Sequence, residues 1–349
     1  MKLETKINLI KNTLSNSQYI TKGRLEKFLK HNNYCSTEEC DYNEEMSKRV
    51  VADVDKTILE LQEYEYDKNY KYFSLYEFDD EDILKKINEL KKLEKINKDD
   101  NDYWSYTMEK PTVKEYENKM DIKFSLLLKE REIRENLIKY TVIVTIFKVE
   151  KLVCIKYYSV SEEFYESEFY ININNGAKRW IEHNLDIVLK EFDSMKIFKS
   201  LYNSIKNNNN QHEYESIHSI LMDDEMNGRS YFKASDTGML PFLSQLGELA
   251  QTFESKEDKE KLIKYVTRYE DEAIIRNIAI KWEHKFSNSR GRVGNITVGI
   301  NKIYSVNNAE DSLKYEFTLH HIRQNEGINR ERINYVIEFL SKYSNGIKE

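Results

Sequence analysis

The fold is decided by residues 271–339, which begin DEAIIRNIAIKWEHKFSNSRGRVGNITVGINKIYSV. Three runs in this stretch are rich in β-branched residues and are separated by turn-forming residues, a pattern that predicts strands. The predicted strands cover residues 273–286, 295–306 and 313–320. A helix is expected over residues 328–340, because Ile333, Val336 and Phe339 recur at helical spacing. The stretch therefore predicts three antiparallel strands followed by a helix.

An earlier stretch, residues 140–192, repeats this order of elements. Its predicted strands cover residues 140–147, 152–160 and 168–173, and a turn at 174–176 leads into a helix. Both predicted helices begin with the signature Asn-x-Gly-x-x-Arg, from Asn174 to Arg179 and from Asn325 to Arg330. We therefore expect a pseudo-symmetric antiparallel βββα-βββα domain with both helices on one face of the sheet. This α+β domain spans residues 139–349, with halves at 139–206 and 271–345 joined by a mostly helical insert.

The N-terminal residues 1–78 predict a helical unit closed by a hairpin. Apolar residues at helical spacing indicate three helices, the third over residues 44–63. Tyrosine-rich runs on both sides of residues 67–69 predict the hairpin. Three helices followed by a hairpin is the order of a winged helix-turn-helix, so this unit is interpreted as winged-helix-like. Residues 79–138 are then expected to be a helical linker region, with a helix over residues 121–137.

Composition limits the classes of function. The chain has 349 residues and a formal net charge of -7, so contact with nucleic acid must be local. No apolar run reaches transmembrane length, and the N-terminus lacks a signal-peptide core. Three cysteines (Cys35, Cys40 and Cys154) do not make a disulfide framework, which predicts a cytoplasmic protein without membrane contact. His31, Cys35 and Cys40 do not have the spacing of a zinc knuckle, so no metal site is predicted.

The loop at residues 287–294 holds Arg290 and Arg292 next to glycines, in a chain that is acidic overall. This concentration of basic charge predicts contact with a phosphate backbone, which would weaken with salt and ignore base sequence. Arg179 and Arg330 fall in the predicted first turns of two helices, where free N–H groups and the helix dipole favour phosphate. The same arginines also suit a solvent-exposed surface, and the loop suits a hairpin tip that blocks strand pairing. The predicted nucleic-acid contacts are Arg290, Arg292, Lys285, Lys281, Arg179, Arg330, Lys22, Arg24 and Lys27.

A second pattern in the sequence consists of two acidic residues and a lysine that could act together in catalysis. Asp271 is followed, after a β-rich run, by Glu283 and Lys285. This order resembles the Asp…(Asp/Glu)-x-Lys pattern of the restriction-endonuclease-like nucleases, in which two carboxylates hold a divalent cation and the lysine helps to activate water. The resemblance implies Asp271, Glu283 and Lys285 as catalytic residues and Mg²⁺ as the cofactor. The strand before Glu283 is more polar than in that family, and the expected antiparallel order differs from its mixed sheet.

The patterns together favour a non-enzymatic nucleic-acid-binding protein, with DNA as the preferred partner, that works in regulation, in a mobile element or in phage defence. The chain has no P-loop, dinucleotide fingerprint, Gly-x-Ser-x-Gly or kinase signature. One alternative is a metal-dependent nuclease, the only case in which a cofactor is expected. The other is a protein–protein scaffold whose acidic N-terminal helices form the interface. A homodimer is compatible with each of these.

Overall fold

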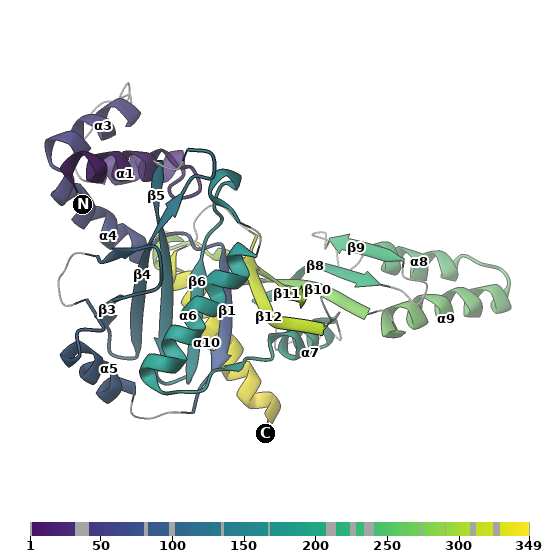
Figure 1. Cartoon of the computed structure of the whole chain (residues 1–349). Coiled ribbons are helices and arrows are strands. Elements are labelled where there is room, and N and C mark those ends of the chain that lie inside the picture. The colour runs from purple at the N-terminus through teal and green to yellow at the C-terminus, as the bar shows by residue number, and fades with distance from the viewer. Residues whose placement is uncertain are drawn as a thin grey trace. The chain divides into compact units, whose positions relative to one another are not determined.

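The computed structural model is a mixed α+β protein in which helices accompany mostly antiparallel strands (Figure 1). It describes residues 2–31, 42–79, 83–97, 102–133, 136–166, 168–206, 214–223, 228–233, 241–272, 274–289, 291–307, 312–323 and 329–348. The chain divides into two compact units, Met1–Phe192 and Asp193–Glu349, so the division falls inside the predicted 139–349 domain. Within the described ranges, no helix combines the length and the apolar character that a membrane crossing requires.

Four helices open the N-terminal unit. They are α1 (Leu3–Ser15), α2 (Lys22–His31), α3 (Tyr42–Ala52) and α4 (Val54–Tyr66). The single helix expected over residues 44–63 is divided at Asp53, whose side chain accepts the backbone N–H of Lys56 and caps α4. Asp53, with φ -155° and ψ 83°, lies outside both helices and separates α3 from α4, which the continuous apolar stripe did not reveal.

The hairpin expected around residues 67–69 is not formed, and this prediction was wrong. The helix α4 runs to Tyr66, and β1 (Tyr72–Glu77) pairs antiparallel with β6 (Leu152–Tyr157) and with β7 (Lys190–Glu191). The tyrosine that was expected in the hairpin, Tyr70, is buried and donates its hydroxyl to the carbonyl oxygen of Glu65 at 2.7 Å. Long-range strand pairing and tyrosine packing therefore override the local turn signal, and the winged-helix interpretation loses the hairpin on which it rested.

The sheet of this unit has the order β2-β4-β5-β6-β1, with β3 on β4 and β7 on β1. Its further strands are β2 (Trp104–Ser105), β3 (Thr112–Glu115), β4 (Lys119–Lys129) and β5 (Leu137–Phe147). All its strand pairs are antiparallel except β2 with β4. The helix predicted over residues 121–137 was wrong, because Met120, Ile122 and Phe124 alternate with polar residues and are fully buried on β4.

Two helices accompany this sheet, α5 (Ile83–Lys92) and α6 (Phe169–Leu185), and α6 packs on β5 and β6. The strand and turn predicted at 168–176 lie inside α6, so both predictions were wrong. The buried amide of Asn174 donates to the hydroxyl of Tyr76 at 2.6 Å, and Gly176 lies against the side chain of Met108. Asn and Gly favour turns locally, but here their small size and amide fit a helix into the core.

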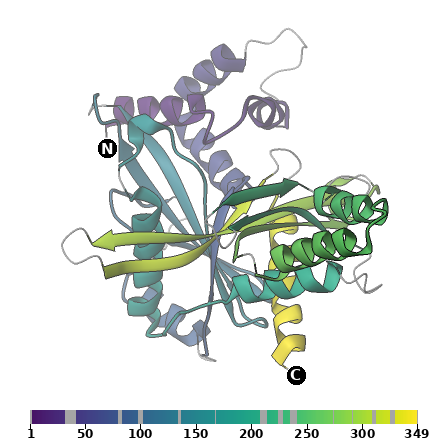
Figure 2. The same cartoon turned by 90° about the vertical axis from the view of Figure 1, so that its right-hand side faces the viewer.

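The second unit contains an antiparallel sheet of order β12-β11-β10-β8-β9. Its strands are β8 (Glu215–Asp223), β9 (Arg229–Lys233), β10 (Ile274–His284), β11 (Gly294–Asn307) and β12 (Ser312–Ile322). Its helices are α7 (Ser194–Lys206), α8 (Pro241–Gln251), α9 (Lys256–Glu272) and α10 (Arg330–Lys348). The three strands and final helix predicted for residues 271–339 are confirmed, and the turn predicted at 325–327 lies outside the described residues. The insert holds a paired β8 and β9 besides the α8–α9 helical hairpin, which Figure 2 shows side by side.

One face of this second sheet carries the core. Trp282 of β10 is fully buried between Phe198 of α7 and Phe339 of α10, with ring centroids 5.8 and 5.9 Å away. On the same face, the imidazole of His320 and the hydroxyl of Ser194 share a hydrogen bond of 2.8 Å. Alternation along the strands therefore points the neighbouring residues to the opposite face.

Candidate functional site

The opposite face of the second sheet is polar, and Arg323 lies at its centre. Arg323 directly follows β12, and its guanidinium donates to the hydroxyls of Ser219 on β8 (2.8 Å) and Tyr231 on β9 (3.1 Å). A third bond of 2.9 Å reaches the amide oxygen of Asn277 on β10. We call these four residues the Arg323 cluster. Four separate segments supply it, so tertiary structure alone brings it together.

A glycine makes room for this arginine. Gly299 on β11 lies under the guanidinium, and a methyl group in its place would come within 2.9 Å of the Arg323 Nε. The side chain of Arg323 can therefore lie flat across the sheet and reach β8, β9 and β10. In this position it presents a planar donor group together with hydroxyl and amide groups.

Cations dominate the electrostatics around the cluster. Burial lowers the pKa of His218, and the nearby charges of Arg323, Lys233 and Lys281 lower it further. The hydrogen bonds from Ser219 and Arg323 also lower the pKa of the Tyr231 hydroxyl. The part of both pKa shifts that comes from the neighbouring cations favours an anion over a further proton.

The acidic groups nearby are already paired with cations. Asp223, at the end of β8, binds Arg229 at 2.9 Å and Arg276 at 2.8 Å, and these bonds lower the pKa of its carboxyl to about 2. Glu283 accepts a hydrogen bond from the ammonium of Lys281. Two arginines thus bind one carboxylate, whereas the described partners of Arg323 are all neutral groups.

The basic loop at 287–294 is anchored to the start of α10. The carboxylate of Glu331 accepts the backbone N–H of Ser287 at 2.9 Å. The guanidinium of Arg332, only 7% exposed, donates to the side chain of Asn288 at 2.9 Å and to the backbone oxygen of Asn295. Arg332 is not among the predicted nucleic-acid contacts, yet it fixes the loop in which Arg292 is exposed; Arg290 lies outside the described residues.

The other predicted contacts are scattered. Arg179 is exposed in the third turn of α6 and not at a helix N-terminus, because α6 already begins at Phe169. Arg330 does open α10, but the amide oxygen of Asn329 already accepts a first-turn N–H there at 3.2 Å. On α2, Lys22 is exposed and Arg24 is partly buried beside a tyrosine, while the side chain of Lys27 lies outside the described residues.

The nuclease pattern does not assemble into a described metal centre. Asp271 belongs to α9 rather than to a strand, and its side chain lies outside the described residues. Glu283 is bound by Lys281, and Lys285 is exposed beyond the end of β10. In the part of the chain that the structure describes, no three His, Cys, Asp or Glu side chains gather as metal ligands.

The N-terminal unit contains a buried group of four charges, which we call the ionic cluster. Lys139 on β5 binds Glu65 at 2.8 Å and Asp102 at 2.7 Å, and Lys123 on β4 binds the same carboxylates at 3.2 and 3.0 Å. Each of the four side chains is at most 2% exposed. Two positive and two negative groups satisfy one another here without solvent, so the ionic cluster has the properties of a structural element.

Comparison with known proteins adds no match: no family model fits the chain, and no curated protein or solved structure is similar to it. The geometry of the described residues is therefore the only guide to function.

Proposed function

We propose that the protein binds nucleic acid, with DNA as the expected partner, along the polar face of the second sheet. The observation that carries this proposal is the Arg323 cluster, in which a guanidinium on the face of the sheet bonds to hydroxyl and amide oxygens and, among the described residues, to no carboxylate. Arginine, serine, tyrosine and asparagine side chains are typical donors to phosphate and sugar. Lys233 adds positive charge nearby, whereas Lys281 is paired with Glu283.

The exposed ring of Tyr231 supports a contact with bases as well as phosphates. It is 56% exposed at the edge strand β9, while its hydroxyl is held by Arg323. Aromatic rings on sheets provide stacking surfaces for unpaired bases, and stacking does not depend on base sequence. We therefore propose a preference for single-stranded over duplex substrates.

The test is fluorescence anisotropy with labelled single-stranded and duplex oligonucleotides across a salt titration. Arg323→Gln should weaken binding about tenfold, because it removes a charged donor to phosphate. It should also reduce the slope of log affinity against log salt by about 1. The matched control is Lys256→Gln, an exposed lysine at the start of α9 in the same unit, which should change affinity less than about twofold.

Parallel samples with Mg²⁺ and the variant Glu283→Ala separate this proposal from the nuclease. Cleavage that Glu283→Ala abolishes, with binding retained, would favour the nuclease. Absence of binding to DNA and RNA at low salt would contradict the proposal and favour the scaffold. Binding to RNA alone would keep the site but change the partner.

A further inference from the structure

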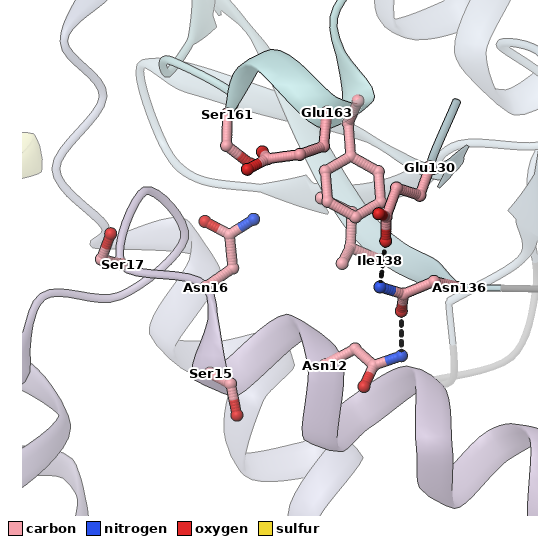
Figure 3. A pocket seen from close by; sticks show the side chains of 10 residues that line it. Asn12, Ser15, Asn16, Ser17, Glu130, Asn136, Ile138, Ser161 and Glu163 are labelled. Atoms are coloured by element: carbon pink, nitrogen blue, oxygen red, sulfur yellow. Dashed lines mark hydrogen bonds between the residues drawn. The ribbon is translucent and has the colours of Figure 1, made fainter. Parts of the chain in front are cut away.

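An open pocket of about 380 Å³ lies in the N-terminal unit, and none of the predicted site residues is among the described residues that line it. Its walls come from the end of α1, the β4–β5 connection and the short helix Glu162–Phe164 (Figure 3). Three segments that are distant in sequence thus form one wall each. A pocket built in this way is preorganised by the fold rather than by a single loop.

Hydrogen bonds orient one wall of the pocket. The amide of Asn12 donates to the side-chain oxygen of Asn136, whose amide in turn donates to the carboxylate of Glu130 (Figure 3). Each amide nitrogen donates within this series of bonds, and the side-chain oxygen of Asn12 and the remaining lone pairs of Glu130 can accept further hydrogen bonds. This wall therefore presents acceptors.

The opposite wall of the pocket also presents acceptor oxygens. Figure 3 shows Ser161 and Glu163 above the side chain of Asn16, which extends toward them. Glu163 is exposed, and its backbone is fixed by a hydrogen bond of 2.9 Å from the N–H of Arg131 to its carbonyl oxygen. The guanidinium of Arg131 donates to the carbonyl oxygen of Glu162 and does not line the pocket.

The side chains that line the pocket include two carboxylates and two apolar groups. Glu130 and Glu163 face a common space, and none of the described lining residues is basic. Phe164 and Ile138 supply the apolar surface, and an aromatic ring attracts a cation placed over its face. The two carboxylates disfavour a phosphorylated or carboxylated compound and favour a ligand with N–H donors and a positive charge.

We propose that this pocket binds a small organic cation, an aliphatic polyamine with primary ammonium groups. The ammonium groups would donate to the carboxylates of Glu130 and Glu163, and the methylene chain would pack on Phe164. The volume accommodates several carbon and nitrogen atoms rather than a single metal ion. Among the described residues, no set of three metal-ligating side chains occurs there either. The proposal does not depend on nucleic-acid binding, because the residues belong to the other unit.

The experiment is isothermal titration calorimetry of the full chain with spermidine and with putrescine, in the absence of nucleic acid. Glu163→Gln and Glu130→Gln keep the shape of the side chain and an acceptor oxygen but remove the charge. Each should weaken spermidine binding about tenfold, the loss expected for one charge-assisted hydrogen bond. The control is Glu162→Gln, a neighbouring exposed glutamate outside the pocket with the same change of charge, and it should stay within about twofold of the wild type.

Sorbitol and Mg²⁺ serve as comparison ligands in the same titrations. We expect both to bind more weakly than spermidine. Equal losses in Glu162→Gln and Glu163→Gln would show diffuse surface attraction and overturn the proposal. Sorbitol binding that Glu163→Gln leaves unchanged would overturn it in favour of a neutral hydroxylated ligand. Absence of heat with either amine at millimolar concentration would also overturn it, provided that circular dichroism shows a folded protein.

Discussion

The ionic cluster of the N-terminal unit and the Arg323 cluster of the second unit both place cations on the face of a sheet, but their charge balance differs. In the ionic cluster two ammonium groups meet two carboxylates, and every partner is buried. In the Arg323 cluster the guanidinium bonds, within the described ranges, to hydroxyl and amide oxygens and to no carboxylate, and Tyr231 is open to solvent. A balanced buried group stabilises a fold, whereas an unbalanced exposed group is free to attract an anion.

The pKa shifts express the same difference. Burial opposes ionisation of Glu65 and Asp102, but the ammonium groups of Lys139 and Lys123 outweigh it and lower both pKa values. Burial likewise opposes protonation of Lys139, but the two carboxylates outweigh it and raise its pKa. The cations around His218, by contrast, act with burial and lower its pKa. The first group is self-neutralising, and the second has surplus positive charge.

The largest expected effect comes from breaking the balance of the ionic cluster. Lys139→Met leaves two buried carboxylates with one ammonium group, which should lower the free energy of unfolding by about 3–5 kcal/mol. Urea unfolding followed by circular dichroism measures this loss. The matched control is Lys114→Met, because Lys114 pairs with the exposed Glu63 at 2.8 Å, and it should cost less than about 1 kcal/mol. Equal effects would refute the contrast between the buried and exposed pairs.

The ionic cluster also predicts how stability depends on pH. Glu65 has a folded pKa below its ordinary 4.5, so its contribution is fully present above that pH and is lost as the pH falls further. Lys139 has a folded pKa above 10.5, so its contribution is present below that pH and lost above it. The free energy of unfolding should therefore be highest between these limits and fall by about 1–3 kcal/mol in acid, which urea unfolding at a series of pH values measures. Asp102→Asn should make the free energy of unfolding depend less on pH in acid. An unchanged dependence on pH would contradict the assignment of the acid sensitivity to the ionic cluster.

Gly299→Ala tests the Arg323 cluster without removing the arginine. The added methyl group must displace the guanidinium, which is the flexible end of a side chain, so stability should change by less than about 1 kcal/mol. Nucleic-acid affinity should fall nearly as far as in Arg323→Gln, about tenfold. The control is Gly247→Ala on α8, where an added methyl group meets no atom within 4 Å. Unchanged affinity in Gly299→Ala would remove the geometric basis of the proposed site.

The basic loop provides a smaller effect. Lys285→Ala combined with Arg292→Ala removes two exposed cations, which should weaken binding a few-fold for every sequence and reduce the salt slope by about 2. Anisotropy in the same salt series measures both quantities. A greater loss than in Arg323→Gln would make the loop the main contact and the sheet face a secondary one.

The smallest expected effect concerns the reactivity of a buried cysteine on the strand next to β1. Cys154 of β6 is fully buried, and burial raises the pKa of its thiol to about 12. Alkylation with iodoacetamide followed by peptide mapping should leave Cys154 unmodified in the folded protein and modify it in urea. Modification in the native state would show that this sheet opens more readily than its packing indicates.

Parts of the fold were predictable because they depend on local pattern. The strands at residues 274–284, 294–307 and 312–322 and the final helix α10 follow from periodicity alone. The predicted pseudo-symmetric βββα repeat is matched only in part. Its first half matches in the strands β5 and β6, but its third strand is the first part of α6.

The candidate site was much less predictable. Lys281 was named in advance and lies on the polar face, but Arg323 carries no motif, and its partners Ser219, Tyr231 and Asn277 are far from it in the chain. Gly299 could have indicated the site, because a glycine inside a strand often marks a position where another group lies close to the backbone. The ionic cluster gave no local signal, because Lys123 and Lys139 interrupt apolar strands and their partners come from other segments.

The sequence by itself determined which segments have strand or helix periodicity, that basic charge is local, and that the first unit starts with amphipathic helices. Tertiary structure decided where β1 pairs, why Asn174 and Gly176 belong to a helix, and which charges meet. The physical reason is that periodicity reports only whether a side chain faces an apolar interior. Which residue lies opposite depends on strand pairing between distant segments, and the sites of this protein are made of such pairs.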